Sequence, residues 1–112
     1  MASCNANAAD TEAPDFKKTR IEYRLHSRNL GDVGFPTPTD TKLTVLFSGH
    51  AAKDLFDHLR KDRYDACAAR EKARYRATPG EGLVCLRYQD GSYSCGLGVD
   101  LNAGKLSVGL IC

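Results

Sequence analysis

The chain has no tryptophan, and its only methionine is Met1. No apolar stretch approaches the roughly 20 residues that a membrane-spanning helix requires, so we expect no such helix. Basic and acidic residues nearly balance, with a formal net charge of +2, which argues against a strong polyelectrolyte role. These absences leave a chain of 112 residues, long enough for one domain with one modest core.

The sequence also has no Cys-x-x-Cys pair. A thioredoxin-type redox site needs that motif, and a structural zinc site usually brings close cysteine pairs to one ion. Four cysteines are instead spread through the C-terminal half of the chain: Cys67, Cys85, Cys95 and Cys112. An even, widely spaced set on glycine-punctuated strands predicts two disulfides, an oxidising location, and neither a metal nor another cofactor.

Sequence patterning predicts an α+β domain over residues 16–112, after a disordered tether at residues 1–15. Alternating residues at 19–26 predict a strand with Ile21, Tyr23 and Leu25 on its buried face. A loop at 29–41 leads to a second strand at 42–47. An amphipathic helix follows, with Ser48 as its N-cap and apolar residues recurring at helical spacing, namely Ala51, Ala52, Leu55, Phe56 and Leu59.

Residues 61–77 combine alanines that favour a helix with alternating residues that favour a strand, which we place at 72–77. Three further strands at 83–88, 93–101 and 105–111 form an antiparallel meander. The expected fold is therefore an antiparallel sheet with a C-terminal three-stranded meander. One main helix packs on one of its faces, and disulfides staple the domain.

Strand parity predicts how the cysteines pair. Asp90-Gly91 is typical of a two-residue type I′ turn, which would put Cys85 and Cys95 on opposite faces of the sheet. Pairing Val99 with Val108 would place Cys95 opposite Cys112. We therefore expect Cys95–Cys112 and Cys67–Cys85 disulfides, and no Cys85–Cys95 bond unless the turn holds three residues.

The start of the chain bears on its location. No apolar export signal is present, so we expect that a targeting segment has been removed and Met1 added. Ala2-Ser3-Cys4 resembles the end of a bacterial lipobox, in which the cysteine is acylated, and this makes Cys4 a lipidation candidate. The alternative is an incidental thiol in a disordered tail.

No catalytic constellation is evident. His26, His50 and His58 are the only histidines, and the Asp54/His58 pair has the spacing of a solvated helix surface. The N–H groups after Ser48 could hold an anion, but a capping role is the more natural interpretation. We expect no catalytic residue and therefore no enzyme.

A basic stripe at Arg70, Lys72, Arg74 and Arg76 would line one face of a strand. Such a stripe suits an anionic partner, either an acidic protein or an anionic envelope component such as lipid headgroups or glycans. The alternative is a solvated edge strand, where basic residues discourage aggregation. Nucleic acid is not expected, since the export argument places the chain away from it and no aromatic stacking platform is present.

The segment from Leu43 to Leu59, then Gly82-Leu83-Val84-Cys85 and Tyr93-Ser94-Cys95 followed by Gly104, resembles small proteobacterial envelope lipoproteins of unassigned function. The resemblance implies an exported, lipid-anchored protein of the periplasm or cell envelope, attached to the membrane only through Cys4. We expect a non-enzymatic binding or scaffold domain. The alternative is an inhibitor or immunity-type factor against an envelope or secreted hydrolase, with the 29–41 loop or the basic stripe as its contact.

Overall fold

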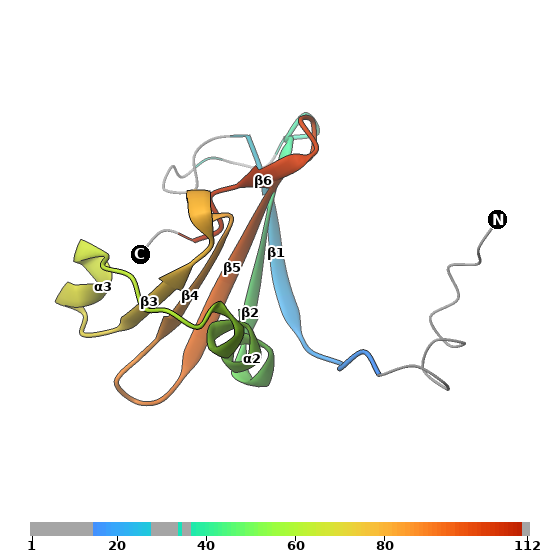
Figure 1. Cartoon of the computed structure of the whole chain (residues 1–112). Helices are drawn as coiled ribbons and strands as arrows, with labels where there is room; N and C mark the ends of the chain where they lie inside the picture. Colours follow the sequence, from blue (N-terminus) through green and yellow to red (C-terminus); the bar gives the residue numbers. More distant parts are fainter. Residues whose placement is uncertain (1–14, 28–33, 35–36, 111–112) are drawn as a thin grey trace.

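The computed structural model describes residues 15–27, 34 and 37–110. Its α+β class agrees with the sequence prediction: the strands form one antiparallel sheet, and one main helix packs on it (Figure 1). The strands are β1 (Ile21–His26), β2 (Lys42–Ser48), β3 (Arg74–Ala77), β4 (Leu83–Arg87), β5 (Tyr93–Asp100) and β6 (Lys105–Ser107). The helices are α2 (Gly49–Leu59), α3 (Ala66–Arg70) and the 3₁₀ turn η1 (Pro79–Glu81).

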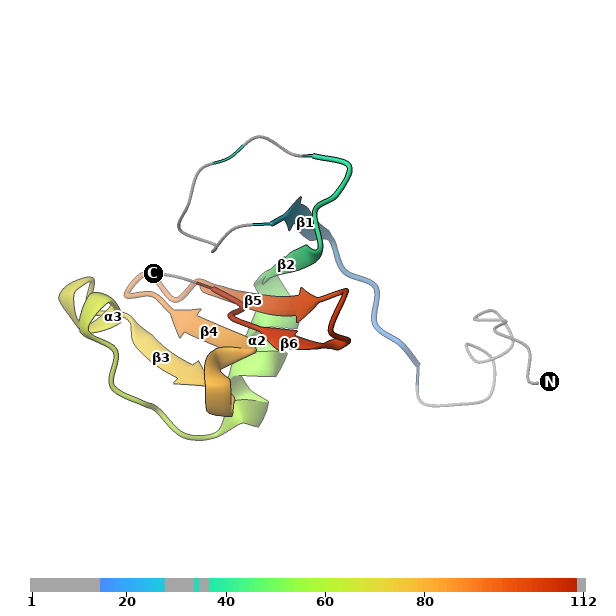
Figure 2. The same ribbon diagram turned by 90° about the horizontal axis from the view of Figure 1, so that it is seen from above.

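The sheet runs in the order β1-β2-β5-β4-β3, with β6 added to β5. This order puts β1 at one edge and β3 at the other, and Figure 2 shows the two strands far apart. Tyr23 lies opposite Val45 in the β1–β2 pair, and Val45 lies opposite Leu97 in the β2–β5 pair. Side chains on one face therefore line up across the strands.

Helix α2 covers the face that carries Cys85 and Cys95. Ala52 and Phe56 of the helix form a buried cluster with these cysteines, and Phe47, Leu55, Leu59, Leu83 and Tyr93 pack around it. Ser48 is the N-cap residue of α2, as predicted, but its side chain makes no capping hydrogen bond. The chain turns from strand to helix through Gly49, at φ +61°, a conformation that glycine adopts without a Cβ penalty.

The opposite face carries a second small core. Ala68 of α3 packs with Tyr75, Val84 and Leu86, flanked by Ala73, Ala77, Tyr88 and Leu110. Residues 108–110 cross this face so closely that a Cβ on Gly96 would overlap the Gly109 carbonyl oxygen. Glycine at the crossing therefore lets two backbone segments touch.

Residues 61–77 contain both of the structures that the sequence favoured. Alanines form α3, whose N-cap Asp65 accepts a hydrogen bond from the Ala68 backbone N–H at 3.0 Å. The chain then turns through Lys72, at φ 57°, before β3 begins at Arg74. The predicted strand start at 72 is two residues early, because Lys72 belongs to this turn.

The meander is present, but its first turn differs from the prediction. Arg87 lies opposite Tyr93, and the Tyr88 N–H donates to the Ser92 carbonyl, so the turn has three residues rather than two. Asp90 stabilises this longer turn by accepting hydrogen bonds from the Ser92 N–H at 2.9 Å and the Ser92 hydroxyl at 2.6 Å. The extra residue changes the parity of β4 and brings Cys85 directly opposite Cys95.

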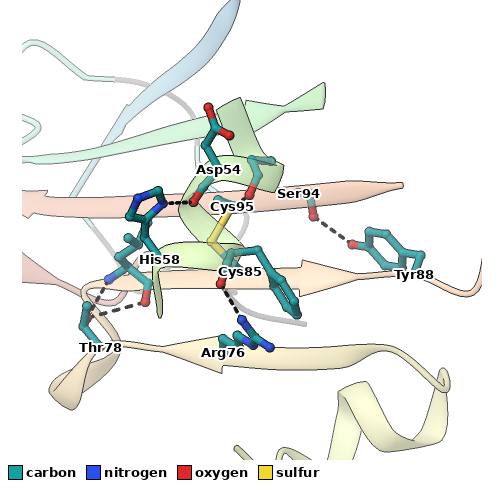
Figure 3. Close-up of a disulfide and its surroundings, with 11 residues drawn as sticks. Asp54, His58, Arg76, Thr78, Cys85, Tyr88, Ser94 and Cys95 are labelled. Atoms are coloured by element: carbon teal, nitrogen blue, oxygen red, sulfur yellow. Dashed lines mark hydrogen bonds between the residues drawn. A yellow bond between two sulfur atoms is a disulfide. The ribbon is translucent and has the colours of Figure 1, made fainter. Parts of the chain in front are cut away.

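The predicted cysteine pairing is therefore wrong. Cys85 and Cys95 form a disulfide with each other, across adjacent strands and beneath α2 (Figure 3). This bond excludes both Cys67–Cys85 and Cys95–Cys112. The last register is also shifted, since Val99 lies opposite Leu106 rather than Val108. The shift is two residues, so the predicted face of β6 is kept.

Candidate interaction surface

Strand β1 exposes an apolar row at the edge of the sheet. Ile21 is 50% exposed, Tyr23 70% and Leu25 43%. The sequence predicted that these three side chains share a face, which the β1–β2 register agrees with, but the prediction that they are buried is wrong. The reason is coverage, because α2 packs over β2, β5, β4 and β3 rather than centrally over β1.

The two edge strands of the sheet, β3 and β1, differ in the hydrogen-bond partners of their outward-facing backbone groups. At the β3 edge, Arg63 donates from its backbone N–H to the Tyr75 carbonyl at 2.8 Å and from its side chain to the Ala77 carbonyl at 3.3 Å. Residue 63 therefore caps the outward carbonyls of β3. Within the part of the chain that the structure describes, no strand pairs with the outer side of β1.

A groove lies beside β1, with a volume of about 560 Å³. Apolar Leu46 and Leu110 line it, together with polar groups from Arg20, Glu22, Ser48 and Ser94. Leu46 lies opposite Glu22 in the β1–β2 pair, so the groove follows the polar face of β1. The strand thus has exposed apolar side chains on one face and a partly polar hollow on the other.

The predicted basic stripe is not continuous. Arg70 lies in α3 and Lys72 in the following turn, so only Arg74 and Arg76 share a face of β3. Both of these arginines are held by Asp62, with Arg74 Nε at 2.9 Å and Arg76 Nε at 2.8 Å from its carboxylate oxygens. The two guanidinium groups also lie over the Phe56 ring, at 5.3 and 4.2 Å from its centroid.

This arrangement lowers the charge that β3 offers to a partner. Hydrogen bonds from Arg74 and then Arg76 lower the pKa of Asp62 from 3.8 to about 2, so the carboxylate is ionised and offsets positive charge at neutral pH. The Arg76 side chain is only 12% exposed and donates from Nη1 to the Phe56 carbonyl at 2.9 Å. Arg70 and Lys72 remain exposed, but they do not extend β3.

The remaining candidate residues do not gather into a site. Cys85 and Cys95 are fully buried in their disulfide, and Cys67 is disulfide-bonded as well. His58 Nδ1 lies 2.7 Å from the Asp54 carbonyl, and His26 Nε2 lies 2.9 Å from Thr44 Oγ1. Among residues 15–27, 34 and 37–110 there is no cluster of three potential metal ligands.

Several predictions concern residues outside the described ranges. They include the tether as far as residue 14, the lipidation candidate Cys4, the cysteine Cys112 and most of the 29–41 loop. In the part of the chain that is described, no helix is both long and apolar enough to cross a bilayer.

Sequence patterning did not predict that the apolar face of β1 is exposed, although the size of the predicted helix relative to the predicted sheet indicates it. An 11-residue helix is about 16 Å long and 10 Å wide, and strands lie about 4.8 Å apart. One such helix spans three or four strands, which agrees with the contacts of α2 with β2, β5, β4 and β3, whereas the sequence predicted a wider sheet. Some apolar face therefore had to lie outside the cover of α2.

No protein-family model matches this chain, and comparisons with curated proteins and with solved structures found no match either.

Proposed function

We propose that this protein is a small exported domain of the cell envelope that binds a polypeptide by strand addition at β1 and catalyses no reaction. The observation that carries the proposal is edge strand β1, whose outer side pairs with no strand in residues 15–27, 34 and 37–110, and on which Ile21, Tyr23 and Leu25 are exposed along one face. A strand in this position offers backbone donors and acceptors to an extended segment, and alternate side chains give specificity.

The disulfide supports the location. Cys85–Cys95 links neighbouring strands in the core, and such structural bonds persist mainly in oxidising compartments. A rigid, cross-linked sheet also suits a binding role, because an ordered edge loses less conformational freedom when a partner docks. Attachment to the membrane through Cys4 belongs to the same proposal and rests on the lipobox-like Ala2-Ser3-Cys4.

Matched variants test the binding surface. Tyr23 and Tyr64 are both exposed tyrosines, 70% and 84% respectively, and Tyr64 lies near the β3 edge rather than on β1. The wild-type chain, Tyr23→Lys and Tyr64→Lys are each immobilised and exposed to an extract of envelope proteins. We expect one bound polypeptide to be retained by wild type and Tyr64→Lys and reduced at least tenfold by Tyr23→Lys, because a lysine on an edge strand opposes strand pairing.

Hydrogen exchange provides the second readout. Strand addition should slow exchange of the amides in residues 21–26 when the captured polypeptide is bound. Equal retention by the two variants, or unchanged exchange in β1, would remove this strand as the binding surface. Retention of nothing by the wild-type chain would count against a binding function at this edge.

A further inference from the structure

Strand β1 has an unusual sequence for an edge, because its charges are arranged in a self-complementary way. Glu22 and Arg24 flank Tyr23 on the face opposite the apolar row, with Ile21 and Leu25 one step further out. A strand that pairs antiparallel with its own copy about a two-fold axis brings residue i opposite residue j and residue j opposite residue i. Charge then decides which registers are allowed.

Among the antiparallel registers centred on Glu22, Tyr23 or Arg24, only the one centred on Tyr23 pairs opposite charges on one face and apolar side chains on the other. With Tyr23 opposite Tyr23 of a second copy, Glu22 faces Arg24 twice and Ile21 faces Leu25 twice, so opposite charges meet and apolar side chains meet. Centring the pair on Glu22 or on Arg24 would put like charges directly opposite each other, which is destabilising. A register shifted by one residue would place Tyr23 opposite a charged side chain.

We infer that the partner at this edge is a second copy of the same chain, and that β1 pairs with β1 antiparallel about a two-fold axis through Tyr23. The inference rests on the proposed strand addition and names its occupant. The β2–β1–β1–β2 sheet formed in this way continues through both molecules. Its two apolar rows lie side by side on the same face of the sheet as α2, beyond the part of that face that the helix covers.

A charge exchange tests the register. Glu22→Arg places arginine opposite arginine at two positions, and Arg24→Glu places glutamate opposite glutamate. The double variant Glu22→Arg/Arg24→Glu restores both opposite-charge pairs. In sedimentation equilibrium over a range of protein concentrations, we expect each single variant to raise the dimer dissociation constant about tenfold or more, and the double variant to return it close to the wild-type value.

A cysteine cross-link gives a readout that does not depend on charge. On a Cys4→Ser background, Tyr23→Cys should form a disulfide-linked dimer on mild oxidation, because residues on the two-fold axis are direct neighbours across the strands. Ile21→Cys is the matched control, since its copy would lie four residues away along the strand, roughly 13 Å, too far for a disulfide. Both positions are exposed, so neither change disturbs the core.

The outcomes separate the two proposals. A wild-type chain that stays monomeric, single variants that dimerise normally, or Ile21→Cys cross-linking as readily as Tyr23→Cys would each overturn the self-pairing. If the chain is monomeric but captures another protein in a Tyr23-dependent way, strand addition stands and the second copy is wrong. If neither dimer nor capture is found, both proposals fail.

Discussion

At the scale of single residues, the arginines of β3 are used within the protein. Arg76 illustrates this best, because its guanidinium contacts the Asp62 carboxylate, the Phe56 carbonyl and the Phe56 ring at once. Arg74 adds a two-point contact to the same carboxylate, with Nη2 at 3.1 Å from the second oxygen. A basic residue in the sequence therefore says little about an anionic partner until its own acidic neighbours are known.

The pKa of Asp62 makes this cluster testable. Because the folded pKa of about 2 lies below the usual 3.8, the cluster stabilises the fold above about pH 4 and loses that contribution as the pH falls toward 2. Asp62→Asn should lower the free energy of unfolding by about 1 kcal/mol at pH 7, a value reduced for the solvent exposure of the pair. Urea unfolding at pH 7 and at pH 2 measures the difference, which should nearly vanish at the lower pH.

Asp57 offers the control for this experiment. It pairs with Lys53 at 2.7 Å on the exposed surface of α2, so we expect Asp57→Asn to lower the free energy of unfolding clearly less than Asp62→Asn does. An Asp62→Asn effect no larger than the Asp57→Asn effect would contradict a special role for the Arg74–Asp62–Arg76 cluster.

At the scale of elements, the sequence was informative about which strands exist and weaker about how they join. Alternation located β1, β2, β4 and β5 within one or two residues. The β4–β5 turn was mispredicted because Asp90-Gly91 is compatible with both a two-residue and a three-residue turn. The hydrogen bonds between Asp90 and Ser92 that favour the longer turn are side-chain contacts, and one residue of turn length reversed the parity of Cys85.

The prediction that the apolar face of β1 is buried was wrong for a different reason. A period-two pattern shows which side chains of β1 share a face, but coverage depends on where other elements pack. Ile21, Tyr23 and Leu25 could have been identified as exposed only by comparing the size of α2 with the width of the sheet. The sequence therefore predicted the strand that forms the candidate site and the face that its apolar residues share, but it did not predict that this face is exposed.

The Cys85–Cys95 bond predicts which tryptic peptides of the unreduced protein are joined. Trypsin cleaves after Arg76, Arg87 and Lys105, so without reduction the peptides 77–87 and 88–105 should be recovered joined. Replacing both cysteines by alanine should lower the free energy of unfolding by about 3 kcal/mol, because the cross-link restricts the unfolded chain. Peptide 77–87 joined to one that contains Cys67 would instead restore the pairing expected from a two-residue turn.

At the scale of the whole molecule, one sheet separates two small cores. The α2 core contains the disulfide, and the opposite core is closed by α3 and by the segment at residues 108–110. The Tyr75 hydroxyl in this second core donates to Glu81, and burial together with that contact raises the pKa of Tyr75. Cys67 of α3 is disulfide-bonded, and the close packing of residues 108–110 against the sheet is a second contribution to the stability of this core.

Glycine at the crossing controls that packing. The Gly109 N–H donates to the Glu81 carbonyl at 2.8 Å, and a Cβ on Gly109 would overlap the carbonyl oxygens of Gly96 and Gly82. Gly109→Ala must therefore separate two backbone segments, and we expect it to lower the free energy of unfolding by about 2–3 kcal/mol.

Gly91→Ala is the matched control. A Cβ there meets nothing within 4 Å, and only its φ of +86° opposes alanine, so the expected cost is about 1 kcal/mol. Urea unfolding compares the two variants, and hydrogen exchange adds the location: Gly109→Ala should speed exchange in α3 and β3 more than in α2, because it loosens only the core behind the sheet. Equal costs for the two variants would mean that residues 108–110 do not hold the second core closed.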